Sequence, residues 1–158
     1  MARTVDNLMK MFTSGSESNI RYMAFAEAAD KEGQPNAAKI FRAIATAKMF
    51  HALSHFRATK YTDTTAENLK QALEEETYDF KNAYPPMVQD AVKDEALEAR
   101  HSLEYGMSIG PVIAKLISKA MGNSDAAESD SYYVCPVCGN IEFGKGAGEM
   151  PFLRRRRK

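Results

Sequence analysis

Residues 69–87, which read LKQALEEETYDFKNAYPPM, decide the fold. Apolar residues recur there at intervals of four and three, and one carboxylate falls on the same stripe. The stripe consists of Leu69, Leu73, Glu76, Phe80, Ala83 and Met87. This spacing predicts a helix with one face in a protein core, and it places Glu76 on that face with Asp79 one turn further along. The two prolines that follow predict a kink or a break after Tyr84.

A second helix of this kind is predicted downstream, from about Asp94 to Met121. Its inner stripe is Ala99, Leu103, Gly106, Gly110, Ile113, Ile117 and Ala120. Pro111, in the middle of the segment, predicts a bend. No alternation typical of strands occurs before residue 131, so the chain is predicted to be all-α up to that point.

Two more helices are predicted upstream, over residues 4–32 and from Pro35 to about Lys60. Gly33 favours the end of the first helix, and Pro35 suits the first turn of the second. The inner stripe of the first helix is Met9, Thr13, Glu17, Ile20, Ala24 and Ala28. The polar link Thr62–Thr65 supplies an N-cap for the third helix. Four helices joined by short links predict an antiparallel four-helix bundle.

The second helix carries polar side chains on its apolar stripe. That stripe is Phe41, Ile44, Lys48, His51 and His55. Polar groups on a core face lower stability unless partners satisfy them. The inner stripes of the first and third helices offer Glu17, Glu76 and Asp79 as partners for Lys48 and His51.

The composition is that of an ordinary soluble protein with one domain and a small appendage. Of the 158 residues, 27% are charged and 44% are hydrophobic, and 21 basic residues balance 21 acidic ones. No apolar run approaches the ~18 residues of a membrane span. Because no basic segment followed by an apolar one marks a secretion signal, we expect a cytoplasmic protein without a membrane partner.

Carboxylates from facing bundle helices, together with Glu-x-x-His pairs, are how proteins build di-iron and di-manganese sites. Carboxylate oxygen and imidazole nitrogen suit iron, manganese or zinc. A complete site of this kind needs glutamate where Lys48 stands. It also needs a Glu-x-x-His on the fourth helix, where the stripe has Gly110 and Ile113.

The chain resembles the rubrerythrins over essentially its full length. The matching segments are residues 16–22 and 25–26 in the first helix, 39–45 and 51–55 in the second, 67–70, 75–79 and 84–85 in the third, 99–100 and 102–105 in the fourth, and 133–139 and 141–144 in the tail. The resemblance implies a ferritin-like di-iron bundle, a rubredoxin-like iron centre, peroxide reduction and a homodimer.

The resemblance also assigns positions in the bundle site. Glu17, His51 and Glu76 occupy ligand positions unchanged, and Asp79 keeps a carboxylate on a shorter arm. Lys48 replaces a bridging glutamate, and the fourth helix has lost its glutamate and histidine at Gly110 and Ile113. Tyr22 and Tyr84 match tyrosines near the family's metal site.

These departures lead to a hypothesis for the core. Charges in a dry interior must be paired, so Lys48 is expected to form an internal salt-bridge network with Glu17, Glu76 and Asp79. The alternatives are that Lys48 reaches solvent without a role, or that one iron, manganese or zinc ion is held by Glu17, His51, Glu76 and Asp79. We do not expect a di-iron centre.

The bundle is predicted to occupy residues 1–121, a small polar linker residues 122–131, and a truncated rubredoxin-like β knuckle residues 132–158. Tetrahedral iron or zinc in such a knuckle needs four thiolates. Cys135 and Cys138 supply two, while Met150 and Leu153 stand where the family spacing places the second pair. The pair is interpreted as a remnant without function, as a dithiol that forms a disulfide, or as half of a zinc or iron site shared by two chains.

The chain ends in the basic run Arg154–Lys158. We expect a solvated tail, with an anionic partner as the alternative and no support for nucleic acid. The sequence therefore predicts a rubrerythrin-like protein that is weakly active or inactive, because both metal centres are incomplete. A single-ion metal-binding protein and an active peroxide reductase with altered ligands are the alternatives.

Overall fold

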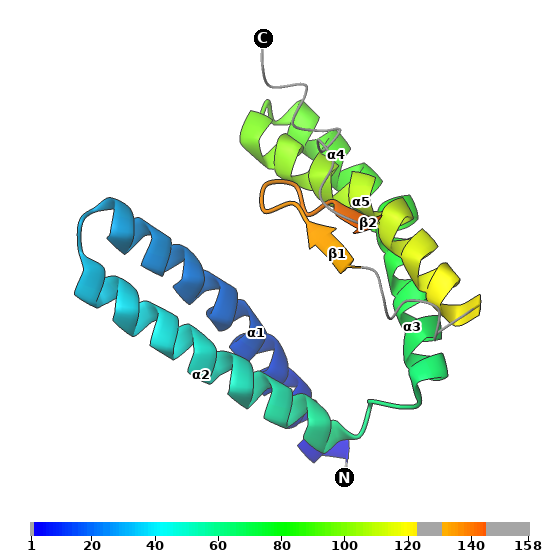
Figure 1. Cartoon of the computed structure of the whole chain (residues 1–158), viewed down its shortest axis with the longest axis horizontal. Coiled ribbons are helices and arrows are strands. Elements are labelled where there is room, and N and C mark those ends of the chain that lie inside the picture. Colours follow the sequence, from blue (N-terminus) through cyan, green and yellow to red (C-terminus); the bar gives the residue numbers. More distant parts are fainter. Residues whose placement is uncertain (1, 123–130, 145–158) are drawn as a thin grey trace. The chain divides into compact units, whose positions relative to one another are not determined.

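A computed structural model describes residues 2–122 and 131–144, and within them the fold is mostly helical (Figure 1). The elements in chain order are α1 (Ala2–Lys31), α2 (Pro35–Thr59), α3 (Thr65–Tyr78), the π-helical turn η1 (Asp79–Ala83), α4 (Tyr84–Lys93), α5 (Leu97–Gly122), β1 (Ser131–Val134) and β2 (Ile141–Gly144). The chain divides into a first unit, Met1–Asp63, and a second unit, Thr64–Lys158, and each is described by itself.

The first unit is a hairpin of α1 and α2, which lie side by side and run in opposite directions (Figure 1). Gly33 adopts a φ of 71°, in the left-handed region that ends helices, and Gln34 donates its N–H to the carbonyl of Ala29 at 2.8 Å. Pro35 then occupies the first turn of α2. The predicted helix end and helix start are both confirmed.

Small residues form the seam between α1 and α2. The buried residues are Gly15, Ala26 and Ala29 on α1, and Ala38, Ala45, Ala52 and Thr59 on α2. The four on α2 recur every seven residues, so they share one face of the helix. Small side chains let two helices pack at short interaxial distance. A Cβ added at Gly15 would lie 3.2 Å from the Cβ of Ala52.

The face of α1 that packs on α2 differs from the predicted inner stripe. Of that stripe, Thr13, Glu17, Ile20, Ala24 and Ala28 are exposed, with Ile20 at 69%. The prediction of that stripe rested on helical spacing alone. The residues buried at the seam are instead mostly glycine and alanine, because small side chains allow the two backbones to approach.

In the second unit, α3, η1 and α4 follow one another without a gap and pack against α5. Thr64 caps α3, its hydroxyl accepting the N–H of Glu67 at 3.3 Å, which confirms the predicted N-cap. The wide turn η1 stands where the prolines predicted a kink or break. In a regular α-helix, Pro85 would lack the N–H that bonds a carbonyl one turn back, and its ring would clash with that carbonyl. Just before the proline the helix widens into η1, where the N–H of Tyr84 bonds the carbonyl of Asp79, five residues back.

The last helix, α5, continues through Pro111 as one element. Beyond it, β1 and β2 pair as an antiparallel hairpin in which Tyr132 faces Phe143 and Val134 faces Ile141. Hairpin strands at these positions agree with the predicted β segment. Met150, Leu153, Arg154–Lys158 and nearly all of the predicted linker lie outside the described residues.

No helix in the described ranges is both long and apolar enough to cross a membrane.

Candidate functional site

The first unit contributes Glu17, Lys48 and His51 to the predicted site. Lys48 is half-buried, whereas Glu17 and His51 are exposed. Within residues 2–63, the structure gives none of these three side chains a hydrogen bond or ion pair.

The reason for this separation is the orientation of α1. A Cβ at Gly15 would lie 3.4 Å from the carbonyl oxygen of Lys48, so position 15 faces the turn of α2 that carries the lysine. Glu17 follows two residues later, about 200° further around a helix of 3.6 residues per turn. Glu17 therefore points away from Lys48 within this unit.

The second unit contributes Glu76 and Asp79, which lie at the junction of α3 and η1. Both line a pocket of about 300 Å³. Its other lining residues are Phe80, Tyr84, Gly106, Ile109, Gly110, Ile113, Cys138 and Gly139. Of the residues assigned by the family resemblance, the structure thus brings together Glu76, Asp79 and Tyr84 with the positions that have lost ligands, Gly110 and Ile113.

Two glycines of α5 shape this pocket, because aromatic rings occupy the space beside them. A Cβ at Gly110 would lie 2.6 Å from the Cβ of Phe80 and 2.8 Å from its ring. A Cβ at Gly106 would lie 2.5 Å from the hydroxyl oxygen of Tyr84. Neither glycine leaves an empty place for a ligand side chain, since Phe80 and Tyr84 pack directly on the helix backbone.

The electrostatics of the pocket raise the pKa of the Glu76 carboxyl. Partial burial raises the pKa of its carboxyl above the ordinary 4.5, and the nearby carboxylates of Asp79 and Glu75 raise it further. Within residues 64–122 and 131–144, the ion pairs Lys93–Asp90 and Arg100–Glu104 involve neither Glu76 nor Asp79.

Glu76 and Asp79 are the ligand-type carboxylates that line this pocket, and Cys138 adds a thiol. Among residues 2–122 and 131–144, no cluster of three or more histidine, cysteine, aspartate or glutamate side chains could hold an ion. On the second unit Gly110 and Ile113 offer no donor atoms, and Phe80 fills the space beside Gly110. The described part of the second unit therefore lacks two of the ligand side chains that the family resemblance implies for a di-iron centre.

The turn between β1 and β2 carries the two cysteines as free thiols. Cys135 is buried, with 2% of its surface exposed, whereas Cys138 is half-buried and lines the pocket with Glu76. Hydrogen bonds from the backbone N–H groups of Cys138 and Val137 lower the pKa of the Cys135 thiol, and a bond from the Cys138 side chain adds to them. The chain has two cysteines in all, so four thiolates would require a second chain.

The remaining predicted residue, Tyr22, belongs to an aromatic cluster of the first unit. Its ring centroid lies 5.8 Å from that of Phe25 and 6.2 Å from that of Phe41. These distances are those of ordinary aromatic packing, which agrees with Tyr22 serving as a packing residue.

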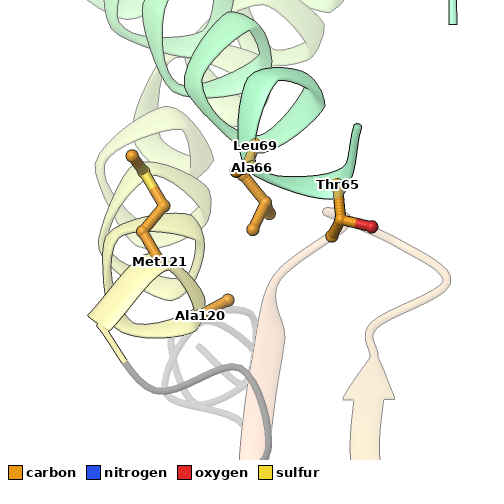
Figure 2. Close-up of a pocket in the computed structure, with 5 residues that line it drawn as sticks. All are labelled: Thr65, Ala66, Leu69, Ala120 and Met121. Carbon is orange, nitrogen blue, oxygen red and sulfur yellow. The ribbon is translucent and has the colours of Figure 1, made fainter. Parts of the chain in front are cut away.

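A second pocket of about 290 Å³ lies between the start of α3 and the end of α5. Figure 2 shows the side chains that line it, from Thr65, Ala66, Leu69, Ala120 and Met121. Apart from the Thr65 hydroxyl these are apolar or small, so this pocket lacks the carboxylate, imidazole or thiolate donors of a metal site.

Sequence reasoning did not foresee the roles of Gly15, Phe80 and Gly106. For Gly15 a signal was available, since α2 repeats alanine at Ala38, Ala45 and Ala52 and such a face needs a close partner. For Phe80 and Gly106 the spacing placed both on core stripes without showing which side chain fills which space.

Comparison with known proteins supports a family assignment. The family model described as Rubrerythrin matches residues 6–107. Rubrerythrin-2 of Clostridium acetobutylicum is 28% identical over 167 residues, covering 95% of this chain and 91% of the relative. Nigerythrin of Nitratidesulfovibrio vulgaris is 26% identical over 166 residues, covering 96% of this chain and 82% of the relative.

Solved structures of nigerythrin resemble this chain in fold. The fully reduced, all-ferrous state has a TM-score of 0.53 at 23% identity, and the partially reduced state has 0.55 at 24%. Each comparison covers 94% of this chain and 80% of the nigerythrin chain. Because the family model spans well over half of the sequence, the chain belongs to the rubrerythrin family.

Proposed function

We propose that this member of the rubrerythrin family keeps the helical scaffold of its relatives but does not assemble a di-iron centre. The family resemblance implies a non-haem iron oxidoreductase that acts in peroxide detoxification. In this chain, we expect a metal-poor core and weak peroxide reductase activity or none.

The observation that carries the proposal is the packing of Phe80 on Gly110. The family resemblance places a ligand glutamate at position 110, but any side chain there would overlap the Cβ of Phe80, which is anchored to its own helix. Overlap with an anchored atom costs more than overlap with a mobile side-chain tip. The absence of a ligand side chain at Gly110 is thus accompanied by the packing of Phe80, from η1, into the space beside it. Such paired changes are expected for a remodelled site rather than for the loss of a single ligand.

The charges support the same proposal. Glu76 and Asp79 repel each other in one pocket, and the missing compensation could come from a metal ion or from a protein cation. Lys48 stands at the position where the family resemblance places a bridging glutamate. We therefore retain Lys48 as the proposed counter-ion of Glu76 and Asp79. Glu17 becomes a weaker candidate for this network, because it is exposed on the far side of α1 from the lysine.

The test is metal analysis of full-length protein purified without added metal, followed by a peroxide assay after incubation with ferrous iron under anaerobic conditions. We expect well under two irons per chain and no iron-dependent turnover above that of free iron. Two irons per chain with saturable peroxide turnover would refute the proposal.

A single-ion site is the second candidate, and the shared pocket of Glu76 and Asp79 favours it. Calorimetric titration with Fe²⁺, Mn²⁺ or Zn²⁺ would then show one ion per chain, with binding lost in Glu76→Gln. The exposed neighbour Glu74 provides the matched control, since Glu74→Gln alters the net charge equally and leaves the pocket intact.

A further inference from the structure

The two cysteines of the β1–β2 turn take no part in the proposed bundle chemistry. Both are free thiols in the structure, and no third or fourth cysteine exists in the chain to complete a tetrahedral metal site with them. Two thiols that do not bind a metal can still be oxidised together to a disulfide, which is a two-electron reaction.

The backbone of the turn holds the two residues in a fixed relation. Cys135 donates its N–H to the carbonyl of Asn140 at 2.8 Å, and Gly139 donates to the carbonyl of Cys135 at 2.9 Å. Gly139 has a φ of 75°, in the left-handed region that glycine adopts without strain. Because the N–H of Gly139, the residue after Cys138, bonds the carbonyl of Cys135, the turn folds Cys138 back toward Cys135.

The two sulfurs differ in access and in environment. Cys138 is half-buried and lines the pocket of about 300 Å³ beside Glu76, so a small solute that enters the pocket meets Cys138 first. Cys135 is 2% exposed. Burial protects the sulfur of Cys135 from direct attack by solutes.

We propose that Cys135 and Cys138 form a redox-active dithiol that a hydroperoxide converts to an intramolecular disulfide. The sulfur of Cys138 attacks the terminal peroxide oxygen, the O–O bond breaks, and the thiol proton passes to the leaving oxygen. This step gives a sulfenic acid at Cys138 and one molecule of water or alcohol.

The buried sulfur completes the reaction. Cys135 attacks the sulfur of Cys138, the S–O bond breaks, the S–S bond forms, and the departing hydroxide leaves as water with the proton of Cys135. With hydrogen peroxide, two thiols and one peroxide give one disulfide and two waters. A dithiol reductant returns the pair to the thiol state by thiol–disulfide exchange.

The test uses the full chain, reduced with dithiothreitol, desalted into a buffer with a metal chelator, and treated with one equivalent of hydrogen peroxide. Thiols are then alkylated and the intact mass is measured. We expect the monomer to lose the mass of two hydrogens, to take up no alkyl groups, and to regain both alkylation sites after renewed reduction.

Two single variants separate the roles of the sulfurs. In Cys135→Ser, peroxide should leave a sulfenic acid at Cys138 that dimedone traps, because no resolving thiol is present. In Cys138→Ser, the buried Cys135 should remain alkylatable after the same exposure to peroxide. Circular dichroism of both variants checks that the helices are retained.

Several outcomes would overturn the proposal. One is that both cysteines stay reduced at an equivalent of peroxide that oxidises free cysteine. Another is that they proceed directly to sulfinic or sulfonic acids, or form only disulfide-linked dimers. A zinc or iron content near half an ion per chain that disappears in Cys135→Ser would instead assign the pair to a metal site shared by two chains. Metal analysis of the same samples distinguishes these results from consumption of peroxide by metal bound at the bundle site.

Discussion

Glycine brings two elements together in both units of this chain, but the elements differ. In the first unit, Gly15 lets the backbone of α1 approach Ala52 and the carbonyl of Lys48 on α2. In the second unit, Gly106 and Gly110 of α5 receive the rings of Tyr84 and Phe80. The first arrangement is a seam between two helices, and the second fills the place where a rubrerythrin would be expected to carry a ligand.

The difference shows two ways in which a glycine lets a helix pack closely against a neighbour. A seam of small residues depends on every position along it, so each substitution has a moderate effect. A ring packed on one glycine depends on a single pair of residues. We therefore expect a single substitution at a glycine to lower stability more in the second unit than in the first.

The largest effect is expected for Gly110→Ala. The new methyl group would lie 2.6 Å from the Cβ of Phe80, and overpacking of this kind costs about 1–3 kcal/mol, against which the better helix propensity of alanine returns less than about 1 kcal/mol. Urea unfolding should show a lower free energy of unfolding than in wild type.

Two further variants locate the cause of that loss. Gly106→Ala should cost less than Gly110→Ala, because its methyl group meets the end of the Tyr84 side chain, which can rotate away. In a Phe80→Gly background the penalty of Gly110→Ala should disappear. A penalty that persists there would mean that Phe80 does not fill the space beside Gly110.

Lys48→Glu should have the second largest effect if the lysine balances the acidic pocket. In chelator we expect a loss of about 1 kcal/mol, the scale of a partly exposed charge pair, and a smaller loss for Lys48→Met, which removes the charge but keeps an unbranched chain. Added Fe²⁺ or Mn²⁺ should restore stability to Lys48→Glu. Equal stability of Lys48→Glu and wild type in chelator would rule out the counter-ion role.

Gly15→Ala tests the seam of the first unit. Its methyl group would lie 3.2 Å from the Cβ of Ala52, so the helices must separate by a few tenths of an ångström. This cost is offset by a helix propensity gain of up to about 1 kcal/mol, and the net change in unfolding free energy should be close to zero. Gly122→Ala, where an added Cβ meets nothing within 4 Å, is the control for helix propensity at the end of α5. A loss at Gly15 as large as that at Gly110 would remove the contrast between the units.

The smallest effect is expected for the pH dependence of Glu76→Gln. Since the pKa of Glu76 is raised in the folded state, the folded protein binds the proton more tightly than the unfolded chain. Wild type should therefore lose stability as the pH rises above the ordinary carboxyl value of 4.5. Glu76→Gln should remove this part of the pH dependence, whereas Glu74→Gln should retain it in the same series of urea titrations.

Much of the fold could be predicted because its signals are local. The spacing of residues 69–87 predicted α3, and Gly33, Pro35 and Thr64 marked helix ends through backbone conformation and hydrogen bonding, which involve residues a few positions apart. The β1–β2 hairpin was likewise predicted from a short segment. The resemblance to the rubrerythrins also came from the sequence, and the family model confirms it.

The candidate site was only partly predictable. Glu76, Gly110 and Ile113 line one pocket, as expected from the stripes, and Asp79 lies beside them. Tyr84, which the family resemblance had indicated, lines the same pocket. Glu17 is exposed instead, because the helix seam turned a different face of α1 toward α2. The hydrophobicity of a stripe indicates that a face is suited to burial, but it does not indicate which partner helix will cover it.

The sequence by itself determined where the first helix ends and where the second and third begin, which ligand-type residues remain, and that two cysteines stand alone. Only the tertiary structure decided that Phe80 would occupy the space beside Gly110 and that Gly15 would face the turn carrying Lys48. The physical reason is that helix ends depend on backbone groups within a few residues, whereas close packing depends on the shapes of side chains far apart in the sequence.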